Sequence, residues 1–338
     1  MRQRAPKGSC SAKMQFHLHF HELYYPLFMQ NQDRNKKRKF DNRRPGKPAG
    51  KFFNNRSKHG AQPQRSFGKK FVKPAVPAQK APAKPESSQS WGHVVSWYDK
   101  LVGDRGSDYQ KNLVLPAALK MLSPKPGQKI LDLCCGQGVF SRCLAGAGVG
   151  QIVAVDISDA MIQAAKLWGE NPNINYVVGD ARNLGDLADS TFDAVACLLS
   201  LHDLDNIEAV FANVAKALKP GGLAVSIIMH PCFRIPRQSS WGWDEKLKIQ
   251  YRRLDRYMTQ MNIPIATHPG SAPTEHTQFF HRPLSAYINA MGKAGLSTTE
   301  CEELISHHSS QPGPRCRAEN RSRQEFPVFL AIKALKIA

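Results

Sequence analysis

The strongest fold signal in this chain is the run Ile130-Leu131-Asp132-Leu133-Cys134-Cys135-Gly136-Gln137-Gly138. It reads as a buried strand that enters a glycine-rich turn, and residues 139–145 continue it as a helix. A strand–turn–helix of this kind points backbone N–H groups and a helix N-terminus at a ligand. Gly136 and Gly138 let the backbone approach that ligand closely, because glycine has no Cβ. The run therefore predicts a ligand site where the first strand ends.

Three further apolar runs follow along the chain, at residues 152–155, 175–178 and 194–201. Helical patterns separate the first strands, notably over residues 160–168. Short apolar strands that alternate with helices are typical of βαβ units and a parallel sheet. The sequence therefore predicts an α/β fold.

An acidic residue lies at or near the end of each of the first three predicted strands. Asp132 lies on the first strand beside its glycine turn, Asp156 ends the second, and Asp180 follows the third. A single aspartate in such a place is explained equally well as a helix cap or a turn residue. Ligands of parallel sheets bind outside the carboxyl ends of the strands. Three aspartates at one such edge therefore favour a binding site over capping.

With these motifs the chain resembles the class I S-adenosylmethionine-dependent methyltransferases, of the broad group (methyltransferase type 11) that includes the ubiquinone-biosynthesis methyltransferases. The family's first motif, acidic-x-Gly-x-Gly-x-Gly, stands here as residues 132–138, with Cys134 in the first glycine position. A small residue is tolerated there if its φ is negative. The segment Leu218-Lys219-Pro220-Gly221-Gly222 matches the family's turn before strand five. The resemblance covers about residues 91–338 and implies a Rossmann-like, seven-stranded, mostly parallel sheet with helices on both faces.

The resemblance also implies S-adenosylmethionine as the cofactor and a role for each motif residue. The glycine turn would cradle the methionine part, and the segment before the first strand would cover the cofactor. Asp156 would accept both ribose hydroxyls, since a carboxylate can take two O–H donors, and Asp180 would accept the adenine amine. The implied cofactor-binding residues are Tyr98, Asp132, Cys134, Gly136, Gly138, Asp156, Ile157, Asp180, Ala181 and Leu198.

A nicotinamide dinucleotide site is the rival interpretation of such a glycine turn. That fingerprint needs Gly-x-Gly-x-x-Gly or Ala, and Ser141 stands at its third glycine position. An acidic residue after the third strand is not part of the fingerprint either. The mismatches favour the methyltransferase interpretation.

Positive charge is concentrated in the first part of the chain. Of a net charge of +20, residues 1–90 contribute +17, from 21 Lys and Arg against 4 Asp and Glu. They bury too little apolar surface to offset their chain entropy, so we expect a disordered basic arm over residues 1–90. Basic side chains on a flexible chain bind phosphates, and interleaved Phe rings stack on unpaired bases. Residues 31–90 therefore favour an RNA partner, with a solubilising tail as the alternative.

Residues 1–28 differ from the rest of the arm. The alternating His17, His19 and His21 lack further ligands spaced to close a metal site. The segment is too short and too polar to span a membrane, and His and Glu interrupt it as a secretory signal. We expect translation to begin at Met29, so that residues 1–28 are not translated.

The 8 cysteines form no Cys-x-x-Cys pair, and several lie in apolar strands, as buried free thiols do. This usage predicts a reducing cytoplasm, no disulfide scaffold and no metal site. No membrane partner is expected.

An insertion over about residues 230–281 follows strand five, where the methyl acceptor must lie. A structureless loop of this length is rare unless functional, so we interpret it as a lid. Aromatic rings would form a stacking wall and arginines would contact anions or bases, although the rings serve equally well as the lid's own core. The lid candidates are Trp241, Trp243, Tyr251, Arg253 and Arg282.

No catalytic base can be assigned from the sequence. Methyl transfer is an in-line displacement in which positioning supplies much of the rate, and a base is needed only if the acceptor must lose a proton. The candidates are His230 and His281, with His202 more distant, and each is more often a structural histidine. Cys232 is a candidate nucleophile, although the other motifs of cytosine-C5 methyltransferases are missing. The Asn/Asp-Pro-Pro-Tyr motif of amine methyltransferases is absent, because strand four ends Ser200-Leu201-His202-Asp203.

The segment His307 to Arg323 lies between predicted strands near residues 300–305 and 328–334. The resemblance places it in the hairpin of strands six and seven, as a basic loop beside the mouth of the active site.

Three functions remain open. The arm favours methylation of RNA, whereas the aromatic lid and the nearly neutral charge of the remaining residues favour a small-molecule acceptor. The third is a non-catalytic RNA-binding factor that has kept the fold. The intact Asp132, Asp156 and Asp180 disfavour this third function.

Overall fold

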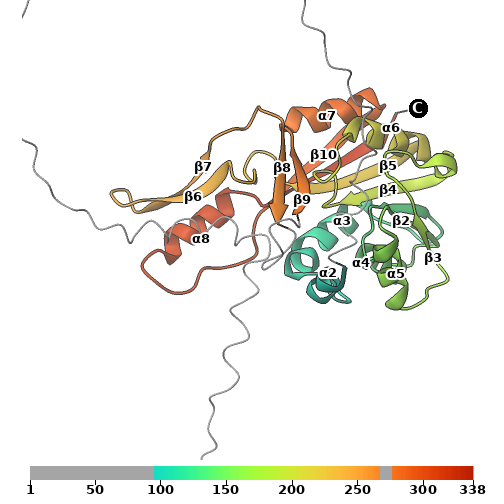
Figure 1. Cartoon of the computed structure of the whole chain (residues 1–338), viewed down its shortest axis with the longest axis horizontal. Coiled ribbons are helices and arrows are strands. Elements are labelled where there is room, and N and C mark those ends of the chain that lie inside the picture. Colours follow the sequence, from blue (N-terminus) through green and yellow to red (C-terminus); the bar gives the residue numbers. More distant parts are fainter. Residues whose placement is uncertain (1–94, 267–275, 338) are drawn as a thin grey trace, which may run out of the picture. The chain divides into compact units, whose positions relative to one another are not determined.

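A computed structural model of the chain describes residues 95–266 and 276–337 (Figure 1). The predictions for the arm, for a start at Met29 and for the alternating histidines lie outside the described residues. The helices are α2 (Val95–Val102), η5 (Gln110–Val114), α3 (Leu115–Leu122), α4 (Val139–Gly146), α5 (Asp159–Leu167), η6 (Gly185–Leu187), α6 (Ile207–Ala217), α7 (Leu284–Lys293) and α8 (Cys316–Glu325). Among the described residues, no helix has the length and apolar character that crossing a membrane requires.

The strands are β1 (Lys129–Leu133), β2 (Gln151–Asp156), β3 (Ile174–Val178), β4 (Phe192–Leu198), β5 (Leu218–Met229), β6 (Ser239–Asp244), β7 (Ile249–Leu254), β8 (Met261–Ala266), β9 (His276–His281), β10 (Leu296–Leu304) and β11 (Phe329–Lys336). Seven of them form one sheet in the order β10-β11-β5-β4-β1-β2-β3. The first five strands are parallel, and β11 runs antiparallel between β5 and β10. The predicted seven-stranded, mostly parallel sheet is confirmed.

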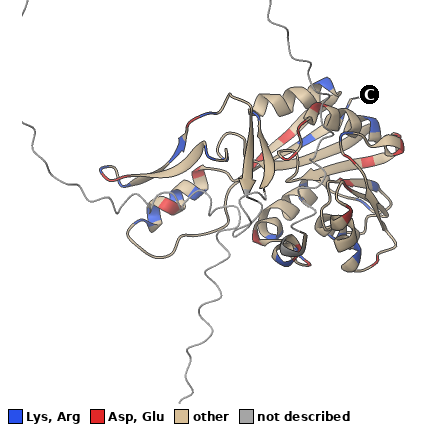
Figure 2. Ribbon diagram, in the orientation of Figure 1, with Lys and Arg blue, Asp and Glu red and all other residues tan. Residues whose placement is uncertain are grey.

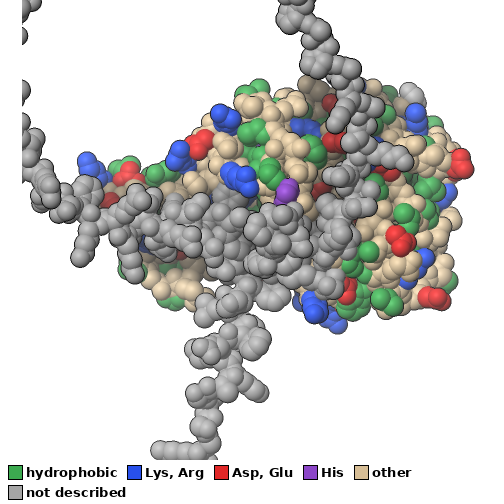
Figure 3. Space-filling view, in the orientation of Figure 1, with side chains coloured by type: hydrophobic (Ala, Val, Ile, Leu, Met, Phe, Trp, Pro, Cys, Tyr) green, Lys and Arg blue, Asp and Glu red, His purple; other side chains and the backbone are tan. Residues whose placement is uncertain are grey.

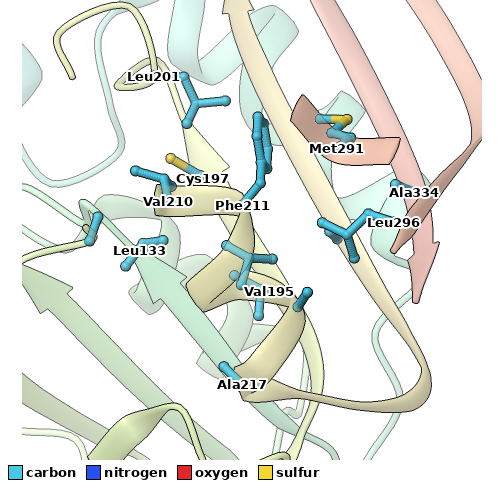
Figure 4. Close-up of a cluster of buried hydrophobic side chains, with 14 of the residues drawn as sticks. Leu133, Val195, Cys197, Leu201, Val210, Phe211, Ala217, Met291, Leu296 and Ala334 are labelled. Atoms are coloured by element: carbon cyan, nitrogen blue, oxygen red, sulfur yellow. The ribbon is translucent and has the colours of Figure 1, made fainter. Parts of the chain in front are cut away.

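Helices cover both faces of the sheet, as expected. On one face, α3 and α4 pack against Ile130 of β1 and Ile152 of β2. On the other, α6 and α7 enclose a cluster that includes Leu133 and Phe211 (Figure 4). Alternate side chains of β1 therefore enter two different cores, which is why the strand reads as a continuous apolar run. Asp132 interrupts that run on the face that α4 covers.

The insertion after β5 is not structureless. It folds into two antiparallel hairpins, β6–β7 and β8–β9. The connection from β10 to β11, predicted as a loop, contains helix α8, and Ser322 Oγ of α8 donates a 2.9 Å hydrogen bond to the carbonyl of Gln250 in β7. In Figure 1, β6, β7 and α8 lie together at one side of the described residues, and β2 and β3 lie at the other.

Candidate functional site

The glycine turn after β1 has the backbone conformation that the motif predicts. Gly136 and Gly138 have φ of +55° and +78°, in the left-handed region that favours glycine. A Cβ added at Gly138 would lie 2.5 Å from Tyr176 Oη, so no larger residue fits there without displacing that ring. The chain reverses tightly at this point and enters α4 directly after Gly138.

Cys134 departs from the expectation of a negative φ, which was wrong. Its φ is +58°, so a side chain occupies a left-handed conformation that costs roughly 1–2 kcal/mol. The next residue holds the turn in place, because the Cys135 N–H donates a 2.9 Å hydrogen bond to the carbonyl of Val155 in β2. A hydrogen bond with the Cys197 thiol, together with burial, raises the pKa of Cys134 well above its usual value. The Cys134 thiol is therefore protonated and poorly reactive.

Asp132 is buried, with 2% of its surface exposed. Its Oδ2 accepts a hydrogen bond from Ser141 Oγ at 2.5 Å, which ties β1 to α4. Burial raises the pKa of Asp132 to about 7, and the Ser141 hydrogen bonds oppose that shift only in part. An aspartate at the start of this turn therefore titrates near neutral pH.

Asp156 at the end of β2 faces the glycine turn. Its Oδ2 accepts a 2.9 Å hydrogen bond from the Gly136 N–H, and its Oδ1 accepts one of the same length from the Ser158 N–H. Burial raises the pKa of Asp156, and these backbone N–H groups oppose the shift. A carboxylate offers about four lone pairs, so the side chain retains accepting capacity toward a ligand.

Asp180, just beyond β3, is held by Arg182. The guanidinium Nη2 lies 2.7 Å from Asp180 Oδ2, and the Arg182 N–H donates to Oδ1 at 2.9 Å. These hydrogen bonds and the positive charge of Arg182 lower the pKa of Asp180, against the opposing effect of its burial. The neighbouring Ala181 is buried, so the first residues after β3 form a fixed wall beside β2.

Helix α2 covers the glycine turn. Tyr98 Cε1 would lie 3.9 Å from a Cβ at Gly136. Gln137 Nε2 donates a 2.7 Å hydrogen bond to the carbonyl of Gly103, and Trp168 Nε1 donates one of the same length to Asp99 Oδ1. Burial, together with the charges of Asp156 and Asp203, raises the pKa of Tyr98 to about 12, while Gln110 opposes the rise. The Tyr98 ring therefore lies between the cofactor motifs and the end of β4.

Just beyond the end of β4 lie a second residue in a strained conformation, the buried His202 and the half-buried Asp203. Leu199 has a φ of +58°. His202 Nδ1 is buried and has no hydrogen-bond partner among the described residues. Burial lowers the pKa of His202 to about 3, and burial raises the pKa of Asp203 well above its usual range. Strained backbone and buried titratable groups cluster at functional sites, so this end of β4 joins the candidate site.

Residues 131–226 match the family model described as a methyltransferase domain. A demethylmenaquinone methyltransferase of Renibacterium salmoninarum is 37% identical over 109 residues, which make up 32% of this chain and 44% of that protein. An uncharacterized methyltransferase of Synechocystis is 34% identical over 125 residues, which make up 36% of this chain and 54% of that protein. The chain thus spans about half the length of the curated relatives it matches.

A solved structure extends the likeness over more of the chain. The S-adenosylmethionine-dependent methyltransferase of Mesorhizobium loti superposes with a TM-score of 0.53 at 26% identity, over 67% of this chain and 97% of that one. This chain carries an S-adenosylmethionine-dependent methyltransferase domain. The site fits that cofactor, since the glycine turn leaves no Cβ in the way and Asp156 has accepting capacity left.

Beyond the residues that match the family model, the β8–β9 hairpin covers the end of β4. The Phe280 N–H donates a 2.7 Å hydrogen bond to the carbonyl of His202, and the Phe279 ring lies 5.0 Å from the His202 ring. Arg282 is buried and donates from Nη2 to the carbonyls of Leu204 and Asp205, each at 2.7 Å. Arg282 therefore anchors the hairpin to the loop after β4.

The predicted histidine candidates have structural partners. His230 Nε2 lies 2.8 Å from Glu303 Oε1, and its Nδ1 accepts a 3.2 Å hydrogen bond from the Cys232 N–H. His281 Nε2 donates to the carbonyl of Tyr257 at 2.7 Å. Cys232 forms a hydrogen bond with the Tyr257 side chain. Through these contacts His230, just after β5, is tied to Glu303 of β10.

The aromatic residues of the predicted lid pack mainly against α8 and its flanks. The Trp241 ring meets the Phe326 ring edge-on at 5.5 Å, and the Arg252 guanidinium lies 5.0 Å from Trp241. The Arg315 guanidinium lies 4.6 Å from the centre of Trp243. The two tryptophans therefore pack between the insertion and the segment around α8, and their role at the acceptor site stays a prediction.

The other two candidates in this hairpin lie at its surface. Tyr251 is exposed and packs over Gly242 on the paired strand, where a Cβ would overlap its ring. Arg253 Nε donates a 2.7 Å hydrogen bond to Asp255 Oδ1. Of the predicted lid residues, Arg282 is the one that contacts the loop after β4.

Sequence reasoning missed Asp203 as a site residue. The available signal was its position, since it follows the fourth strand as Asp156 and Asp180 follow the second and third. Its neighbour His202 is covered by the β8–β9 hairpin, which begins more than fifty residues later. Ile157 and Leu198, predicted to bind the cofactor, are half-buried at the ends of β2 and β4.

Proposed function

We propose that this chain transfers the methyl group of S-adenosylmethionine to a small molecule that binds between Tyr98 and the end of β4. The observation that carries the proposal is the buried His202, which the β8–β9 hairpin contacts, next to the half-buried Asp203, whose charge acts on the Tyr98 hydroxyl. A site enclosed by a hairpin and by α2 suits a compact acceptor better than a polymer strand. The relatives that this chain matches include demethylmenaquinone methyltransferases, and their names support a ring-containing acceptor.

We assign residues to the parts of the cofactor from the hydrogen bonds that each side chain can still form. Asp156 takes the ribose hydroxyls with the lone pairs that Gly136 and Ser158 leave available. Asp180 Oδ2 takes the adenine amine, and the Tyr98 ring closes the turn. Bound S-adenosylmethionine supplies an electrophilic methyl group on a positively charged sulfur.

Asp203 is the residue we assign as the proton acceptor. The acceptor's nucleophilic atom forms a bond to the methyl carbon as the sulfur–carbon bond breaks, and both electrons of that bond stay on sulfur. The proton that the nucleophilic atom loses passes to the Asp203 carboxylate and then to solvent. Burial raises the pKa of Asp203 well above that of a solvated aspartate, which makes the carboxylate a stronger base. His202 is neutral, and its Nδ1 orients the acceptor through a hydrogen bond.

RNA is the second candidate acceptor, and the basic composition of residues 1–90 favours it. In the described residues, Lys and Arg alternate with Asp and Glu along the ribbon (Figure 2). On the part of the surface in Figure 3 that is not grey, neither sign of charge gathers into one patch. Residues 91–338 contribute only +3 of the net charge of +20, so binding of RNA would depend mainly on the arm. The free thiols among the described residues agree with our inference of a reducing cytoplasm.

The deciding experiment offers labelled S-adenosylmethionine and the purified full-length chain to two fractions from cells that lack the protein, total RNA and a small-molecule extract. We expect label in the small-molecule fraction, and we expect the same rate from a variant without residues 29–90. Label in RNA that disappears with that deletion would overturn the small-molecule proposal in favour of RNA. The variant Asp156→Ala serves as the control with weakened cofactor binding, and label in neither fraction would contradict enzymatic activity.

A further inference from the structure

Three metal-ligating side chains meet at a point that the methyltransferase motifs do not use. Asp108 lies just before η5, and His307 and His308 lie just after β10. His307 Nε2 and His308 Nε2 lie 2.9 and 2.8 Å from the same Asp108 Oδ2. The ligand atoms of all three lie within 4.8 Å of one another. Adjacent residues in an extended chain point in opposite directions, so the convergence of two successive histidines on one oxygen requires a specific local backbone.

Neighbouring residues hold the three side chains in this arrangement. Asn112 Nδ2 donates a 2.9 Å hydrogen bond to Asp108 Oδ1, which leaves Oδ2 directed at the histidines. The Tyr109 ring meets the two imidazoles edge-on, at 5.3 and 5.2 Å, and its hydroxyl lies 3.1 Å from Ser306 Oγ. Outer hydrogen bonds and packing of this kind fix the orientation of ligands in metal sites.

We propose that Asp108, His307 and His308 bind a divalent transition-metal cation, Zn²⁺ or a cation of similar preference. Two imidazole nitrogens and one carboxylate oxygen form a ligand set that Zn²⁺ accepts at about 2.0–2.2 Å, with water or a further ligand in the fourth position. Tetrahedral bonds of that length separate the ligand atoms by roughly 3.3 Å, so each of the two His–Asp separations needs to open by about half an ångström. The side chains are 41%, 27% and 25% exposed, which gives the cation a path from solvent.

The site is independent of the proposed acceptor and of the methyltransferase motifs, so binding is measured without turnover. Full-length protein is stripped with a chelator, dialysed and titrated with ZnCl₂ in a calorimeter, and with Co²⁺ followed by its visible absorption. We expect the wild type to bind one equivalent of metal ion more than the double variant His307→Ala/His308→Ala binds. Any binding by the arm histidines at 17, 19 and 21 is common to both proteins and cancels in the difference.

Two single variants separate ligation from folding. Asp108→Asn keeps the size of the side chain and should lose most of the affinity. Asn112→Ala keeps all three ligands and should weaken binding about 10–100-fold, because the carboxylate is no longer oriented. His276→Ala, at an exposed position in β9, is the matched control and should bind as the wild type does. The proposal would be overturned if the wild type, the double variant and Asp108→Asn bound equal amounts of metal ion, or if none of them bound any.

Discussion

Asp132 and Ser141 share a 2.5 Å hydrogen bond in the buried space between β1 and α4. The bond compensates only part of the cost of burying a carboxylate, since burial still raises the pKa of Asp132 to about 7. A residue that the motif supplies for the ligand therefore destabilises the ligand-free fold whenever it is ionised.

The first prediction concerns Asp132→Asn in the absence of cofactor. The folded state of the wild type holds its proton more tightly than the unfolded state, so its free energy of unfolding falls as pH rises from about 4 to about 7. Asparagine does not titrate, so we expect the variant to gain on the order of 2 kcal/mol over the wild type between pH 5 and pH 8. Urea denaturation at both pH values measures the difference. The exposed Asp159→Asn serves as control, and a pH-independent difference for Asp132→Asn would contradict the prediction.

The second prediction tests the left-handed conformation of Cys134. Cys134→Gly and Cys134→Ala both remove the thiol, but only glycine adopts a φ of +58° without strain. We expect the glycine variant to be more stable than the alanine variant by about 1 kcal/mol. The same pair at Cys135, whose φ is not positive, should show the opposite order. An alanine variant at position 134 as stable as the glycine variant would mean that the turn has a different geometry.

The third prediction concerns the affinity for S-adenosylmethionine. Asp156→Ala removes the carboxylate that faces the glycine turn, and we expect binding to weaken by roughly 2–4 kcal/mol, as for loss of charge-assisted hydrogen bonds. Isothermal titration measures the affinity, and thermal unfolding checks that the Gly136 and Ser158 N–H groups left without partners have not unfolded the turn. Asp159→Ala, at the first residue of α5 and three positions after Asp156, should bind S-adenosylmethionine as the wild type does. An unchanged affinity in Asp156→Ala would refute the assigned role.

The fourth prediction separates chemistry from binding at the end of β4. Because burial raises the pKa of Asp203, the rate of a base-dependent transfer should rise with pH through that raised value as the carboxylate ionises. Asp203→Asn should lower kcat by about 10²–10⁴-fold, abolish this rise and leave the affinity for S-adenosylmethionine unchanged. His202→Asn, which keeps a polar group, should raise KM more than it lowers kcat. An intact pH profile in Asp203→Asn would exclude Asp203 as the base.

The strands and the cofactor motifs were predictable because their signals are local. The run that ends at Asp156 is apolar on both faces, which is typical of an inner strand of a parallel sheet, and β3 before Asp180 is a more polar edge strand. Helix α8 was missed because its side chains are almost all polar and Ser322 is its one buried residue, so no apolar periodicity marks it.

The end of β4 was not predictable for a different reason. His202 and Phe279 are 77 positions apart, and their contact depends on how two inserted hairpins fold. The same holds for Trp241, which packs against Phe326 beyond β10. Such long-range partners cannot be recognised from the local sequence pattern of either segment. The sign of φ at Cys134 could not be predicted for a similar reason, because the next residue, Cys135, is held by a hydrogen bond to Val155 in β2.

The position of β11 between β5 and β10 sets the order in which the sheet can be completed during synthesis. β10 precedes β11 along the chain but borders no other strand, so it waits unpaired while α8 and its flanking segments emerge from the ribosome. At ordinary rates of translation this interval lasts a few seconds, and for its duration β5 presents an open, apolar edge. Open edges recruit strands from other chains. Substitutions that delay the docking of β11 should therefore appear first as a lower yield of soluble protein, before any loss of activity in the molecules that finish folding.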